Sequence, residues 1–207
     1  MKDCCEVRTD IPERQRRVLQ VVLWINVGMF LLEFAAGALA NSTALLADSV
    51  DMLGDAIVYG FSLYAVARGG VWQVRAALVK GVTMAALGVG VLVHVIVKVV
   101  AGLAPSPEIM GGIGLLALAA NGVCLFFLWP RRVDDINMRS AWMCSLNDVI
   151  ANVGVLAASA AVAFTGSGWP DIIVGLIIAA VFGASAATVI HSARRGLRAA
   201  RSEAARA

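Results

Sequence analysis

Long apolar runs separated by short connections dominate the chain. A run of about 20 apolar residues is long enough to cross the hydrocarbon core of a bilayer as an α-helix. Three of the five prolines, Pro105, Pro107 and Pro130, fall between the runs, and Pro170 falls in the first turn of the last run, so none of these four interrupts a helix. We therefore expect six transmembrane helices, at about residues 18–40, 44–67, 76–103, 109–129, 141–164 and 169–192.

The composition supports a membrane protein. Hydrophobic residues make up 60% of the 207 positions, charged residues only 15%, and the mean hydropathy is +0.82. Soluble domains are nearer half apolar and about a quarter charged. We expect an all-α integral membrane protein whose lipid-embedded domain covers residues 18–192, with almost no chain left for a soluble domain.

The basic residues predict how the helices are oriented. Of the 17 Lys and Arg residues, all but Lys98 lie in the two tails, in the connections after the second and fourth runs or, for Lys80, in the residues just after the first of these connections. Positive charge accumulates on the cytoplasmic side of a membrane. Both tails, residues 1–17 and 193–207, are therefore expected in the cytoplasm, and we expect the membrane to be a bacterial inner membrane. Lys98, near the outer end of the third run, is expected to extend its amino group toward the outer interface.

Three acids occupy one face of the second helix. Asp48, Asp51 and Asp55 fall at positions i, i+3 and i+7 of an apolar run. An acid at membrane depth costs about 2.5 kcal/mol or more, so its default interpretation is a functional one. Pairing with a base or a serine inside the bundle is the structural alternative, and no Lys or Arg is predicted at this depth.

The fifth helix offers a matching pair. Cys144 and Asp148 fall at i and i+4 of another apolar run. The second and fifth helices run in opposite directions, and the predicted depths of Asp55 and Asp148 agree within about one helical turn. Two pairs, Asp51 with Asp55 and Cys144 with Asp148, can close a four-coordinate cage around a divalent metal such as zinc.

Several segments together resemble one family of transporters. The segment NSTALLADSVDMLGD resembles the second-helix signature of the cation diffusion facilitators, and CSLNDVIANVGVLAAS resembles the fifth-helix signature. NVGMFLLEFAAGALA, PEIMGGIGLLALAANGV and WPDIIVGLIIA extend the resemblance over most of residues 20–195. The resemblance implies a transport site formed by Asp51, Asp55, Cys144 and Asp148. It also implies a homodimer that exports divalent metal, zinc or cadmium or both, from the cytosol in exchange for protons.

Two departures from the family pattern matter. Zinc-handling members commonly carry His where this chain has Asp51 or Cys144. A thiolate favours softer ions than imidazole does. The expected substrates therefore include cadmium as well as zinc, with mercury as the softest. Most members also carry a cytoplasmic metal-binding domain after the sixth helix. The chain resembles the branch that lacks this domain. We expect no permanently bound cofactor and no enzymatic activity.

The charges of the cage suggest how metal and protons exchange. Three carboxylates and a thiol in a low-dielectric cavity repel one another, so the empty site is expected to hold protons. Metal binding then expels them. Rocking of the helices around a midplane site would expose it to each side in turn.

Other polar residues are weaker candidates for metal or proton binding. Asp48 lies nearer the outer face and would serve as an access or capping group. The vicinal cysteines Cys4 and Cys5 are suited to capturing a thiophilic ion, or are simply exposed thiols. The remaining candidates are Glu33, His94 and Asn121, each of which would serve equally well in a helix-to-helix hydrogen bond.

Three other functions are compatible with the sequence. A membrane thiol-redox or mercury-handling protein would depend on Cys4 and Cys5 rather than on the aspartates. A passive cation channel needs only an acid-lined pore, and a subunit without transport activity would need a membrane partner. Nucleic acid is excluded as a partner because the basic residues lie scattered at loop edges.

Small residues predict where helices approach closely. Gly175, Ala179, Gly183 and Ala187 repeat every four residues along the sixth helix. Such a stripe lets two backbones pack at short distance, so we expect it to form a helix interface.

Overall fold

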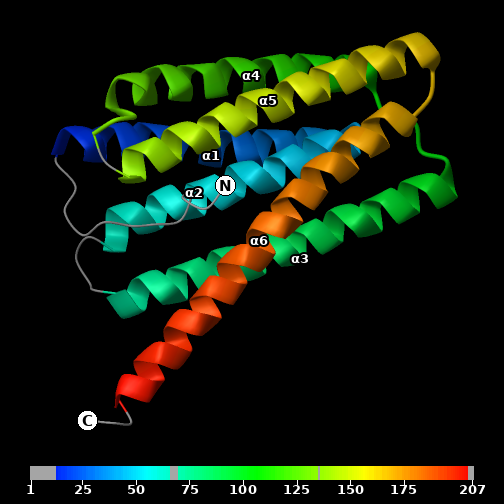
Figure 1. The fold of residues 1–207 in the computed structure, drawn as a ribbon. Helices are drawn as coiled ribbons and strands as arrows, with labels where there is room; N and C mark the ends of the chain where they lie inside the picture. The colour runs from blue at the N-terminus through cyan, green and yellow to red at the C-terminus, as the bar shows by residue number, and fades with distance from the viewer. Residues whose placement is uncertain (1–12, 66–69, 135, 205–207) are drawn as a thin grey trace.

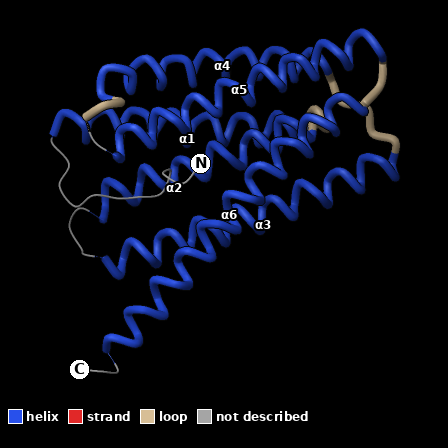
Figure 2. The backbone as a smooth tube through the Cα atoms, viewed as in Figure 1, coloured by secondary structure: helices blue, strands red, loops and turns tan. Residues whose placement is uncertain are grey.

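The computed structural model of the chain describes residues 13–65, 70–134 and 136–204, and within these ranges it is helical apart from short connections (Figures 1 and 2). Long α-helices follow one another along the chain, and a short 3₁₀ turn, Trp129–Arg131, follows the fourth. The helices are α1 (Glu13–Leu39), α2 (Thr43–Ala65), α3 (Gly70–Ala101), α4 (Pro107–Leu128), α5 (Ile136–Thr165) and α6 (Trp169–Ala204). The six-helix prediction is confirmed.

The helices form an antiparallel bundle organised around α2. In Figure 1, α1, α2, α4 and α5 lie together, while α3 and α6 cross on the other side of α2. α2 packs against α1, α3, α5 and α6. The start of α1 and the end of α6 lie at one end of the bundle, and the connections α1–α2, α3–α4 and α5–α6 lie at the other. By the distribution of positive charge, this second end is the outer one.

Length and hydropathy identify four spanning helices among the described residues. These stretches are Glu13–Leu39, Gly81–Ala101, Pro107–Arg131 and Ala141–Thr165, and α6 contributes a shorter apolar stretch, Trp169–Ala184. α2 is long enough to cross, but Asp48, Asp51 and Asp55 place three acids in any 18-residue window along it. The residues that make α2 polar are buried inside the bundle rather than turned toward lipid.

A buried ion pair ties the outer ends of α2, α3 and α6 together. The Lys98 amino group lies 2.5 Å from a carboxylate oxygen of Asp171 and also donates to the Asn41 carbonyl at 2.6 Å. Lys98 is 2% exposed, so the expectation that it extends to the outer interface is wrong. The Asp171 carboxylate pairs with the Lys98 ammonium inside the bundle, so the ammonium does not need to reach the water at the outer interface.

Asp171 also caps the N-terminus of α2. It accepts hydrogen bonds from the Ser42 hydroxyl at 2.7 Å and from the backbone N–H groups of Thr43 and Ala44 at 2.7 and 3.1 Å. The Ser42 hydroxyl in turn accepts the Leu45 N–H, as an N-cap serine does. A carboxylate at a helix N-terminus is stabilised by the unpaired N–H groups and by the helix dipole. The first turn of α2 is thus fixed to α6.

The small-residue stripe of α6 is only partly an interface. A Cβ at Gly175 would lie 2.6 Å from a Thr43 methyl and 2.9 Å from the Ala44 nitrogen, so α6 touches the α2 backbone there. A Cβ at Gly183 would meet nothing within 4 Å, and this residue is exposed. The close approach predicted from the repeat is therefore confined to its outer end, where Asp171 already holds α2.

Apolar clusters lie on both sides of the acids along α2. Toward the outer end, Ala44–Ala47 and Val50 belong to a cluster that includes Met110, Val155 and Ile178. Toward the inner end, Tyr59 packs with a second cluster drawn from α1, α4 and α5. Asp51 and Asp55 fall between these two packed layers, in the middle of the bundle.

Candidate functional site

The acidic face of α2 points into the bundle. Asp48, Asp51 and Asp55 are 0%, 7% and 3% exposed, as the spacing of i, i+3 and i+7 predicts for one buried face. Long apolar side chains such as Leu45, Leu46 and Val50 pack around them on the same helix. The helix therefore carries its charges inward, against other helices, where an unpaired carboxylate would be most costly.

The acid of α5 faces the acids of α2. Asp148 is 1% exposed, and the strongest charges acting on it come from Asp51 and then Asp55. The two antiparallel helices thus bring carboxylates together at one depth. Cys144 lies one turn away on α5, is half-buried, and together with Asp55 and Asp148 is one of the ionisable groups around the Tyr59 hydroxyl.

The side chains do not form a closed cage in this arrangement. In the part of the chain that the structure describes, no three His, Cys, Asp or Glu side chains stand close enough to hold a metal ion as they are. Asp55 accepts a hydrogen bond of 2.9 Å from the Tyr59 hydroxyl. The four-ligand site of Asp51, Asp55, Cys144 and Asp148 therefore stays a prediction.

Polar atoms without hydrogen-bond partners line the same part of the bundle. Buried polar groups in proteins are nearly always hydrogen-bonded, so a concentration of exceptions needs a reason. Within the described ranges such atoms occur on Asn26 and Glu33 of α1, Asp48 of α2, Asn121 of α4, and Ser145, Asp148 and Asn152 of α5, all at most 1% exposed. Buried oxygen atoms without protein partners inside a membrane bundle are suited to a hydrated ion or to protons.

Two weaker candidates lie next to the acidic face. Both carboxylate oxygens of Glu33 are buried without a hydrogen-bond partner among the described residues, and Asp48 and Asp51 are the charges that act on it. Asn121 directs its amide nitrogen at the Met52 sulfur, 3.9 Å away. These side chains extend the polar region from α2 toward α1 and α4.

The other weaker candidates lie elsewhere. His94 is half-buried near the backbone of Asn41 and the amino group of Lys98, so it belongs to the outer end of the bundle. Cys4 and Cys5 fall outside the described residues. Cys124 is fully buried in the inner apolar cluster, where it serves packing.

Sequence reasoning missed three polar residues near the acids. Tyr59, Ser145 and Asn152 are at most 1% exposed and share a helix face with Asp55 or Asp148. Tyr59 lies four residues after Asp55, and Asn152 lies four after Asp148 and donates to the Asp148 carbonyl at 2.7 Å. The i+4 spacing that revealed the acids was a usable signal for both, because residues four apart stack on one face.

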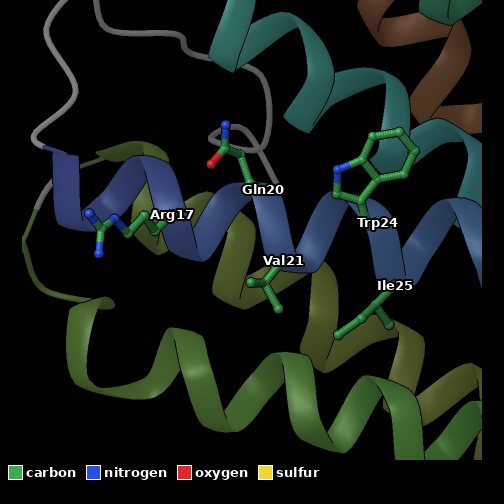
Figure 3. Close-up of a pocket in the computed structure, with 5 residues that line it drawn as sticks. All are labelled: Arg17, Gln20, Val21, Trp24 and Ile25. Atoms are coloured by element: carbon green, nitrogen blue, oxygen red, sulfur yellow. The ribbon is translucent and has the colours of Figure 1, made fainter.

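A surface hollow on α1 is separate from these acids. It has a volume of about 760 Å³ and is lined by Arg17, Gln20, Val21, Trp24 and Ile25, all near the inner end of one helix (Figure 3). Trp24 is 70% exposed, and Arg17 also lies at the surface. None of the residues that line this open hollow carries a carboxylate, so it does not offer the ligands of a metal site.

The fold and its buried acids define an all-α integral membrane protein with a polar region inside the bundle. Residues 19–197 match the cation efflux transmembrane domain, and the chain belongs to that family. It is 24% identical over 181 residues to the metal cation efflux system protein CzcD of Cupriavidus metallidurans, which covers 82% of this chain and 57% of the relative. It is also 24% identical over 183 residues to the cadmium, cobalt and zinc/H(+)-K(+) antiporter of Bacillus subtilis, with coverages of 79% and 57%. The chain thus spans little more than half the length of these relatives.

Proposed function

We propose that the chain is a secondary active transporter that exports a divalent transition-metal cation, zinc or cadmium, from the cytosol in exchange for protons. The observation that carries the proposal is the meeting of Asp51 and Asp55 on α2 with Asp148 on α5, all at most 7% exposed in the middle of a membrane bundle. Buried acids on facing helices of a membrane protein are typical of ion and proton pathways.

Asp51, Asp55, Cys144 and Asp148 are the proposed ligands of the transported ion. Cys144 is half-buried, lies one turn from Asp148 and is one of the ionisable groups around the Tyr59 hydroxyl of α2, which supports its place among the ligands. Three carboxylates and one thiolate form a donor set of mixed hardness, which suits zinc and the softer cadmium. The names of the relatives, which include cadmium, cobalt and zinc, support this substrate class.

Proton exchange follows from the same groups. Carboxylates packed together without solvent are stabilised by sharing protons, and a bound cation displaces those protons. The Bacillus subtilis relative is named as a cadmium, cobalt and zinc/H(+)-K(+) antiporter. We propose an exchange of metal for protons here, with protons entering the cytosol as metal leaves, in an assembly of two copies as the family resemblance implies.

Transport in proteoliposomes tests the proposal. The purified protein, reconstituted with a pH-sensitive dye inside, should take up zinc when an opposing proton gradient is applied and should move protons outward as zinc enters. Asp148→Asn should abolish both fluxes, whereas Asp134→Asn, which alters an exposed acid on the α4–α5 connection, should change neither. Zinc flux that is independent of the proton gradient would indicate a channel, and zinc binding without flux would overturn the proposal.

A further inference from the structure

Tyr59 stands between the buried acids and the inner end of the bundle. Its side chain is 1% exposed and is the largest among the fully buried ones. On the inner side its ring packs into the cluster formed by Leu19, Val22, Cys124, Leu128, Met138 and Ala141. On the other side its hydroxyl reaches Asp55. One residue thus contacts both the proposed ion site and the apolar layer beneath it.

The hydroxyl fixes the orientation of Asp55. It donates to one Asp55 oxygen at 2.9 Å, and the Ala141 carbonyl of α5 is a second acceptor at 3.4 Å. Ala141 lies three residues before Cys144, so the hydroxyl lies where α2 and the start of the α5 site meet. A buried hydrogen bond to a carboxylate restrains the orientation of the side chain.

The ring fills the inner end of the polar region. Leu19 and Val22 of α1, Leu128 of α4 and Ala141 of α5 surround it, each at most 3% exposed. An ion moving from the cytosol to Asp55 along α2 has to pass this layer. Displacing the Tyr59 ring would open this layer more than moving a single aliphatic side chain, because the ring belongs to a cluster that joins α2 to α1, α4 and α5.

We propose that Tyr59 positions Asp55 for metal binding and forms the inner barrier of the ion path. This assignment rests on the proposed function, because it gives Tyr59 its role at that site. Two substitutions test the positioning role and the barrier role separately. Tyr59→Phe removes only the hydroxyl, whereas Tyr59→Ala removes the ring.

The first experiment measures zinc transport. Tyr59→Phe should raise the KM for zinc by about tenfold to a hundredfold, the loss expected for one hydrogen bond to a charged group, while the maximal rate stays within about twofold. A purely structural role would lower the amount of folded protein and leave KM unchanged. An unchanged KM in folded Tyr59→Phe would therefore overturn the positioning role.

The second experiment measures access to Cys144, and it does not depend on transport. In a background of Cys4→Ser, Cys5→Ser and Cys124→Ala, Cys144 is the remaining thiol of the four. A membrane-impermeant maleimide is added to inside-out vesicles, which present the cytoplasmic face. Tyr59→Ala should accelerate labelling of Cys144 by about tenfold, because thiol reactivity follows exposure, and Tyr59→Phe should not.

Leu128→Ala is the matched control, because it removes buried volume from the same cluster without touching Asp55. It should accelerate labelling by less than about threefold. If Tyr59→Ala does not fold, Tyr59→Leu keeps buried bulk and should give an intermediate rate. Equal rates in the Tyr59 and Leu128 variants would overturn the barrier. Tyr59 variants with normal zinc transport and unchanged labelling of Cys144 would overturn this inference and leave the proposed function standing. A wild-type protein that transports no zinc would overturn the proposed function.

Discussion

Lys98 and Asp171, 73 residues apart in the sequence, form a buried ion pair at the outer end of the bundle. The pair joins the last turn of α3 to the first turn of α6, and through Asp171 it also holds the N-terminus of α2. The helix that carries the proposed metal ligands is therefore anchored by residues on two other helices. This relationship leads to a prediction about stability.

Asp171→Asn should destabilise the protein by about 3–5 kcal/mol, because it leaves the Lys98 ammonium buried without its counter-charge. Adding Lys98→Met should recover part of the loss, since the double variant buries no unpaired charge. Thermal unfolding of the detergent-solubilised protein measures both. Glu108→Gln is the control, as this exposed acid lies in the first turn of α4 at the same end. If the loss of stability in the double variant equalled the sum of the losses in Asp171→Asn and Lys98→Met alone, the two residues would not interact.

Gly175→Ala should destabilise the protein by about 1–3 kcal/mol, because the added methyl meets backbone atoms of α2 that cannot rotate away. Gly183→Ala lies on the same helix, has open space around its Cβ, and should be neutral or slightly stabilising. Unfolding temperatures of the two variants make the comparison. Similar values would mean that α6 does not approach α2 closely at Gly175.

Asp55→Asn should weaken zinc binding by about tenfold to a hundredfold, because it removes a proposed ligand without changing the size of the side chain. Asp48→Asn should slow transport but leave one zinc bound per chain, since Asp48 lies a turn nearer the outer end and interacts with Glu33 and Asp51. Isothermal titration of the purified variants gives both affinity and stoichiometry. Loss of the bound zinc in Asp48→Asn would place Asp48 among the ligands.

Cys144→His should shift the transport preference toward zinc and away from cadmium, because imidazole suits zinc while thiolate favours softer ions. The measurement is the ratio of cadmium to zinc flux in proteoliposomes. Cys124→Ser serves as the control, since this buried thiol packs in the inner apolar cluster. A selectivity ratio unchanged by Cys144→His would exclude Cys144 as a ligand.

The sequence predicted the helices and the acidic face because both depend on local periodicity. Apolar runs of membrane length define the spans, and carboxylates at i, i+3 and i+7 must share a face wherever the helix lies. The helices extend beyond the predicted spans, as α5 begins at Ile136 and α6 continues to Ala204. Membrane thickness sets the length of the apolar run, but the helix itself can continue beyond the membrane as a polar segment.

The sequence did not reveal the contacts between distant residues. Lys98 was assigned to the interface because a lone lysine near a span end usually extends its amino group to water. Its partner Asp171 lies in the first turn of α6, where an acid is ordinary, so nothing local linked the two. The i+4 spacing places Tyr59 on the face of Asp55, but the approach of its hydroxyl to the Ala141 carbonyl depends on α5 lying beside α2. Such pairs depend on which helices are neighbours, and periodicity does not encode this.

The capping of α2 by Asp171 sets an order of events during biosynthesis. The Ser42 hydroxyl and the first N–H groups of α2 precede their acceptor by 127–129 residues, so α2 leaves the ribosome and enters the lipid long before α6 has been made. Until then these donors have to be satisfied by water or lipid headgroups. The outer end of α2 therefore reaches its final position only when the last helix inserts, which makes α6 the element that completes the assembly of the bundle.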